Sequence, residues 1–173
     1  MGMIQVAKDS FYQVLRDRIA FANPARTIVI RGLLRPAVLT IENELPGAGL
    51  EASLLAESFC LRWTTLASES QSPGPLVTLG CEILYTSEGS TGAAGMDRGR
   101  GLTALDAELL AALLTMPMST PAVSVAEVPG GGASGITPLG WKIFWGVPRP
   151  QATVMKAERL QRVVEVEVFC YGQ

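Results

Sequence analysis

Hydrophobic and polar positions alternate strictly near the end of the chain, over residues 162–171. One side of an extended segment there carries Val164, Val166, Val168 and Cys170. The other side carries Val163, Glu165, Glu167, Phe169 and Tyr171. Successive side chains of a strand point to opposite faces, so this pattern predicts a strand with one buried face and one partly hydrated face. Such a strand is typical of an antiparallel sheet with an accessible face, because parallel sheets are usually covered on both sides.

Two segments have the three- and four-residue apolar spacing of helices. The first covers residues 4–21 and ends before Pro24, because the residue that precedes a proline avoids the helical region. The second begins at Thr103, where Thr-Ala-Leu-Asp resembles a capping box, and continues to about Leu114. The second helix has few polar positions and is expected to be the more buried of the two.

Alternating or β-branched runs predict the remaining strands. They are expected at residues 26–31, 36–42, 58–66, 76–86, 122–128 and 139–147. Short links predict that the first two strands form one antiparallel hairpin and the next two form another, with a polar loop at residues 68–75. The predicted fold class is therefore α+β: a two-layer sandwich in which about two main helices pack on one face of an antiparallel or mixed sheet. We expect a single domain over residues 1–173, with flexible loops near 87–101 and 129–138.

The composition favours a folded, soluble chain. Hydrophobic residues make up 48% and charged residues 17%, which is unlike a disordered chain. No apolar run approaches the roughly 20 residues that span a bilayer, and the first residues do not resemble a signal peptide. We expect a cytoplasmic product with no membrane partner. The net charge of −2 provides no overall field that would attract nucleic acid.

The chain contains no histidine, which removes the commonest general base and transition-metal ligand and every Ser–His or Cys–His pair. Its three cysteines, Cys60, Cys81 and Cys170, lie in strand-like runs without a C-x-x-C pair. They are expected to be buried free thiols. These observations favour a protein that is not an enzyme and needs no metal or cofactor.

Two glycine-rich segments contain motifs that could bind phosphate. The stretch at residues 130–135 matches G-x-G-x-x-G, but a dinucleotide site requires a helix directly after it, and a tryptophan-rich strand follows instead. A loop is the expected structure. Arg98 and Arg100 lie in the other segment, where paired guanidinium groups could bind phosphate or dock on the acidic face of a neighbouring subunit. A solvated loop is the simpler expectation for them.

Two further groups could form a site on a sheet face. Trp141 and Trp145 share one face of a predicted strand and could stack on a ligand, although packing in the core is expected. Glu165 and Glu167 lie about 7 Å apart along their strand, a separation found in inverting glycosidases. We expect them instead to be solvated or to form a subunit contact or a lumen wall.

The order of elements resembles that of the tail terminator, or tail completion, proteins of long-tailed phages and related contractile injection systems. The matching segments are the N-terminal helix with Phe11-Tyr-Gln-Val-Leu-Arg-Asp-Arg-Ile, the two hairpins, the helix from Leu102 to Leu113, and the closing Val-Glu-Val-Glu-Val strand. The long connections at residues 129–138 and 148–159 depart from the family pattern.

The resemblance implies a structural assembly protein that forms a homo-oligomeric ring, typically a hexamer. Such a ring caps the tail tube, contacts the neck or connector proteins, and meets DNA only as it passes through the lumen. It would be assembled in the bacterial cytoplasm and found in the virion tail. The resemblance transfers no catalytic residue. Two alternatives remain at this point: another tail or connector component, and a small ligand-binding or enzyme-like α+β domain that uses Glu165, Glu167, Trp141 and Trp145.

Overall fold

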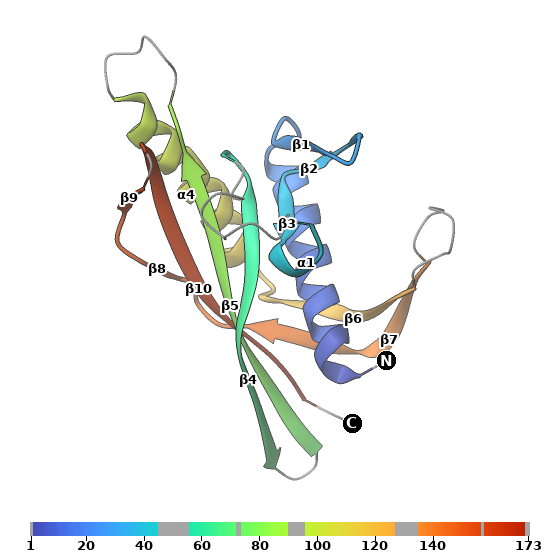
Figure 1. The fold of residues 1–173 in the computed structure, drawn as a ribbon. Coiled ribbons are helices and arrows are strands. Elements are labelled where there is room, and N and C mark those ends of the chain that lie inside the picture. Colours follow the sequence, from blue (N-terminus) through green and yellow to red (C-terminus); the bar gives the residue numbers. More distant parts are fainter. Residues whose placement is uncertain are drawn as a thin grey trace.

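The computed structural model describes residues 2–44, 56–71, 74–89, 96–126, 135–156 and 158–171. Its main feature is a twisted sheet of eight strands (Figure 1). The strands that form its main path are, in spatial order, β3 (Val38–Thr40), β4 (Phe59–Gln71), β5 (Gly74–Ser87), β10 (Arg159–Tyr171), β7 (Gly135–Trp145) and β6 (Ser119–Ala126). All neighbours are antiparallel except β3 and β4, which run parallel.

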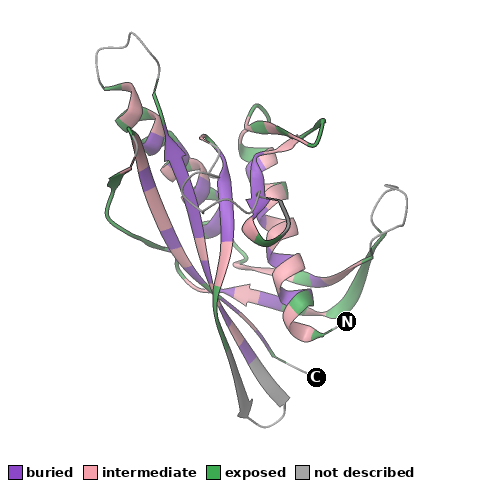
Figure 2. Ribbon diagram, in the orientation of Figure 1, coloured by how far each residue is buried: buried purple, intermediate pink, exposed green. Residues whose placement is uncertain are grey.

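The last strand, β10, lies at the centre of this sheet. It pairs with β5 over its whole length from Leu160 to Tyr171. Its other edge pairs in turn with β9 (Val154–Lys156), β8 (Arg149–Pro150) and the end of β7. The predicted alternation is confirmed: Val164, Val166, Val168 and Cys170 are buried, while the residues between them are partly or fully exposed (Figure 2).

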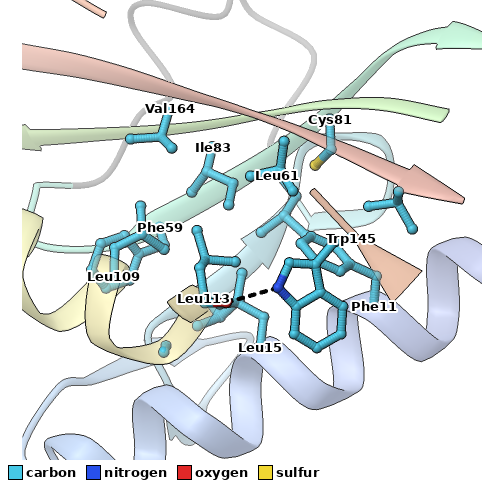
Figure 3. Packing of buried hydrophobic residues seen from close by; sticks show 14 of the residues in the cluster. Phe11, Leu15, Phe59, Leu61, Cys81, Ile83, Leu109, Leu113, Trp145 and Val164 are labelled. Carbon is cyan, nitrogen blue, oxygen red and sulfur yellow. Dashed lines mark hydrogen bonds between the residues drawn. The ribbon is translucent and has the colours of Figure 1, made fainter. Parts of the chain in front are cut away.

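Two long helices, α1 (Met3–Ala22) and α4 (Asp97–Leu114), pack on the buried face of the sheet. Phe11 of α1 contacts the ring of Trp145 edge-on, with ring centroids 5.7 Å apart. The indole Nε1 of Trp145 donates a hydrogen bond to the Leu113 carbonyl of α4 at 2.8 Å (Figure 3). The predicted α+β architecture with helices on one face is therefore confirmed, and the valine face of β10 is the face that meets them.

The end of α4 is completed by a side chain from α1. Arg18 donates hydrogen bonds to the carbonyl oxygens of Ala112, Thr115 and Pro117 at 2.8–2.9 Å. Carbonyls in the last turn of a helix have no partner within the helix, so these bonds satisfy groups that would otherwise need water. Arg18 thus joins the two helices on the core side of the sheet.

The prediction for the first hairpin, in which residues 26–31 pair with residues 36–42, is wrong about the second strand. β1 (Thr27–Ile30) pairs with β2 (Leu33–Pro36) as a separate two-stranded sheet. Its two-residue turn has positive φ at Arg31 (50°) and Gly32 (79°), the backbone geometry that suits a tight hairpin. The second half of the predicted strand at residues 36–42 instead forms β3, which joins β4, and the short helix α2 (Ile41–Glu44).

Three predicted loops are shorter than expected. β4 continues to Gln71 and β5 begins at Gly74, so most of the polar segment at residues 68–75 is strand. α4 begins at Asp97, and β7 begins at Gly135, so parts of the predicted loops at 87–101 and 129–138 are regular structure. In the β4–β5 and β6–β7 hairpins, polar and glycine residues can extend the strands because backbone pairing does not require a buried side chain. Residues 90–95 and 127–134, including most of the G-x-G-x-x-G motif, lie outside the described residues.

Within the described ranges, neither long helix is apolar enough over its length to cross a membrane.

Candidate functional surface on the open face of the sheet

Four charged residues form a row across the face of the sheet that points away from the helices. Arg62 on β4, Glu82 on β5, Glu165 on β10 and Arg149 on β8 are successive register partners. Arg62 Nε donates to Glu82 Oε2 at 2.8 Å, and Arg149 Nε lies 3.8 Å from Glu165 Oε2. Two carboxylates directly opposite each other would repel, so the arginine on the outer side of each one stabilises the row.

A shallow hollow of about 220 Å³ lies beside this row. Glu167 is the register partner of Gly80, and the β-bulge between Trp63 and Thr65 brings Thr64 and Thr65 over that glycine. A Cβ at Gly80 would collide with the Oγ1 atoms of both threonines, so the glycine permits this close approach. The hollow therefore combines threonine hydroxyls with the carboxylates of the row.

The structure confirms that Glu165 and Glu167 share the open face. Glu165 is partly exposed and pairs with Arg149, while Glu167 is exposed. Within the described ranges, no ion pair involves Glu167. The hollow beside them is smaller than the roughly 300–1,000 Å³ of typical small-molecule pockets. This surface resembles a contact surface more closely than a binding pocket for a small molecule.

The tryptophans do not join this surface. Trp145 is buried and Trp141 packs against the same core, on the helix side of the sheet. The register explains the placement, because Trp145 lies opposite Val168, a residue of the buried face of β10. The constellation of Glu165 and Glu167 with Trp141 and Trp145 is therefore not assembled: the two pairs lie on opposite faces.

Arg98 and Arg100 lie in the first turn of α4, not in a loop. Arg98 Nη1 donates to the Glu158 carbonyl at 2.6 Å, which fixes the start of α4 against the turn before β10. Arg100 is exposed beside an open hollow that also contains Met96 and Met155. Leu160 of β10 also lines this hollow. Glu165 lies about 17 Å further along the strand and faces the opposite side of the sheet. The two arginines and the two glutamates thus belong to separate surfaces.

Three aromatic residues lie at the far end of the open face, where Phe144 of β7 joins Phe169 and Tyr171 of β10. Phe144 stacks on Phe169 with centroids 5.8 Å apart and planes 16° apart. Tyr171 contacts both rings edge-on, at 6.2 Å and 6.3 Å. The alternation in β7 and β10 separately places these residues on one face each, but only the pairing of Phe144 with Phe169 shows that the faces are the same.

A half-buried ionic network ties the segment after α1 to α4. Arg26 donates to both carboxylate oxygens of Glu108 at 2.9 Å and 2.7 Å and to Glu57 at 2.7 Å, while Asn23 donates to Glu108 at 2.8 Å. Burial favours the neutral form of Glu108, but the hydrogen bonds from Arg26 and Asn23 outweigh it and lower the pKa of that carboxyl. The hydrogen bond to Glu108 likewise raises the pKa of Arg26. Glu57 and Glu108 are far from Asn23 and Arg26 in sequence, so no local pattern could have grouped them.

The outer face of the β1–β2 hairpin is apolar and exposed. Val29 and Leu34 are register partners, with 62% and 71% of their surface accessible, and Leu33 beside them is exposed to 69%. The inward residues Ile28 and Ile30 pack instead on a small cluster of Leu39, Cys60 and Leu84. The inner face therefore holds the hairpin against this cluster, and the outer face is available for contact with another protein.

The sequence matches no protein-family model, and no curated protein matches it.

Proposed function

We propose that this protein is a structural assembly protein that forms a ring, as a tail terminator that caps a phage-like tail tube and joins it to the neck. The observation that carries the proposal is the exposed apolar outer face of the β1–β2 hairpin, with Val29, Leu33 and Leu34. Contiguous apolar side chains of this kind are usually covered by another protein. The α+β fold and the paired charges of the open sheet face are compatible with the same role.

The proposed assembly is a homo-oligomeric ring, a hexamer by resemblance, with tail-tube and neck proteins as partners. DNA would pass through its lumen without specific binding. The net charge of −2 suits that passage, because each added cation that contacts phosphate would strengthen binding. In this proposal the protein is assembled in the bacterial cytoplasm and becomes part of the virion tail.

The test combines imaging with a functional measurement. Negative-stain electron microscopy of the purified chain should show closed rings with a central hole, alone or on the ends of tail tubes assembled from the tube protein of the same genome. Addition of the chain to growing tubes should stop their elongation. Absence of both rings and end-binding would contradict the proposal.

The hairpin itself provides a matched pair of variants. Val29→Ser with Leu34→Ser should abolish end-binding while the free energy of unfolding stays within about 0.5 kcal/mol of that of the parent protein. The control is Lys156→Ser, a substitution far along the chain on β9, which should preserve end-binding. Unchanged binding by the hairpin variant would show that this face is not the contact.

A further inference from the structure

The long hairpin of β4 and β5 leaves one strand edge open. β3 pairs with β4 only at residues 59–61, and β4 is bulged between Trp63 and Thr65. Beyond the bulge, residues 65–71 pair with β5 in unbroken register, and no described residue pairs with their other edge. This part of the hairpin extends away from both long helices (Figure 1), and β10 continues along its β5 strand as far as Tyr171.

Two other outer edges of the sheet are closed by side chains of α1. Ser10 Oγ accepts a hydrogen bond from the Val123 amide of β6 at 2.9 Å. Tyr12 donates its hydroxyl to the Val38 carbonyl of β3 at 3.3 Å. Such contacts occupy backbone groups that would otherwise bind a further strand.

A proline protects the unpaired edge of β7. β10 pairs with β7 only at residues 143–145, so residues 135–142 have one unpaired edge. Pro138 lies opposite Val123, whose N–H points to Ser10 and thus away from β7. Two residues directly opposite each other in an antiparallel pair point their backbone nitrogens either both toward the partner strand or both away from it. The nitrogen of Pro138 therefore points away from β6, toward the unpaired edge of β7. Because proline has no N–H, it blocks a ladder at that position.

Among the hydrogen bonds of the described residues, none joins a side chain of α1 to the backbone of residues 65–71 of β4. Residues 65–71 include no proline and no lysine, and Glu69 is their one charged residue. Leu66 is 60% exposed. An unprotected edge about 23 Å long carries a row of backbone donors and acceptors that match another strand.

We infer that this edge of β4 pairs antiparallel with the same edge of a second copy, about a two-fold axis. Among the described strands of the main path, the edges of β3, β6 and β7 are closed by Tyr12, Ser10 and Pro138, so a head-to-tail contact within that path would lack a second unprotected edge. Self-pairing uses one edge from each copy and leaves neither open. The main-chain hydrogen bonds of such an added strand supply the affinity. This contact goes beyond the proposed ring, since it joins two chains, or two rings, face to face.

The inference is tested on the full chain by sedimentation equilibrium over a range of concentrations. Leu66→Lys places a charge beside the edge and should raise the dissociation constant of the dimer at least tenfold. Leu114→Lys is the matched control, because Leu114 is 47% exposed at the end of α4 and lies on no strand edge. It should change the constant less than twofold. A chain that stays monomeric at all concentrations, or an equal loss in both variants, would overturn the inference.

Hydrogen exchange gives a readout that needs no variant. In the dimer, alternate amides of residues 65–71, those that point away from β5, should exchange at least tenfold more slowly than in the dilute monomer. Equal exchange rates in the two states would refute strand pairing even if a dimer forms. Rings whose β4 amides exchange freely would support the proposed function and contradict strand pairing. A dimer paired through β4 that forms no rings would support strand pairing and contradict the proposed function.

Discussion

Gly99 and Gly101 lie two residues apart near the start of α4, so they face different sides of the helix and have different surroundings. A Cβ on Gly99 would meet nothing within 4 Å, whereas a Cβ on Gly101 would collide with the buried hydroxyl of Ser87 on β5. That hydroxyl has no hydrogen-bond partner among the described residues. Gly101 therefore sets how closely α4 approaches the sheet, and Gly99 only weakens the helix.

Alanine substitutions should separate these two roles. Gly99→Ala is expected to stabilise the protein by about 0.5–1 kcal/mol, the cost of glycine in a helix. Gly101→Ala should lose that gain because of the collision, and Ser87→Ala combined with Gly101→Ala should recover it, since Ser87 Cβ would remain 3.5 Å away. Urea unfolding of the three variants measures the free energies. Equal effects of the two single substitutions would show that α4 can shift away from Ser87.

Glu108 should make the stability of the protein depend on pH. Its pKa is lower in the folded state than the ordinary value of 4.5, so its stabilising contribution is fully present above about pH 4.5 and is lost as the pH falls through the folded-state pKa. Glu108→Gln is expected to cost about 2 kcal/mol at pH 7 by weakening the bonds from Arg26 and Asn23. The difference between the two proteins should shrink in urea unfolding below pH 4.5. Glu42→Gln, which affects an exposed pair with Lys8, should cost less than about 0.5 kcal/mol.

At the scale of elements, the two faces of the β1–β2 hairpin have different roles. Ile30 faces the cluster of Leu39, Cys60 and Leu84, while its neighbour Val29 faces solvent. A short two-stranded hairpin is marginally stable alone, so this inward packing holds it on the sheet. The alternation within four residues thus separates the anchoring face from the face available to a partner.

Truncation of adjacent residues tests this division. Ile30→Ala should lower the free energy of unfolding by about 1–2 kcal/mol, because it leaves a gap against the small cluster. Val29→Ala should change it by less than about 0.5 kcal/mol. Thermal or urea denaturation decides the matter, and a larger loss at Val29 would mean that the hairpin packs with its other face inward.

For the molecule as a whole, the reactivity of the three cysteines can be used to measure how often the core opens to solvent. Cys60, Cys81 and Cys170 form no disulfide, are buried and lie in β4, β5 and β10. Burial raises the pKa of the Cys81 and Cys170 thiols, which further reduces the thiolate that reacts with labelling reagents. All three belong to neighbouring strands in the middle of the sheet.

A thiol reagent should therefore label none of them in the native protein and all three after denaturation. The labelling rate in low urea should follow the free energy of global unfolding, because central strands open only when the domain unfolds. Mass spectrometry of the labelled protein identifies the sites. Rapid native labelling at Cys60 alone would indicate that the β1–β2 hairpin opens independently of the core.

The order and type of most elements follow from local patterns in the sequence. The two long helices, the central β10 and the inward residues of β4 and β5 were predicted from three-to-four and two-residue apolar spacing, because each element buries one side. The α+β class followed from their order. The burial of the three cysteines without a disulfide likewise follows from their spacing and context.

The central place of β10, the parallel pairing of β3 with β4 and the coincidence of faces on different strands emerged only in the folded chain. The parallel addition of β3 to β4 and the row from Arg62 to Arg149 depend on register between segments far apart in sequence. A shift of one residue between strands moves every side chain to the other face, and local periodicity carries no record of that register. For this reason Glu165 and Glu167 could be placed on an open face from the sequence, whereas the separation of that face from Trp145 and Arg98, and the open edge of β4, appeared only in the folded chain.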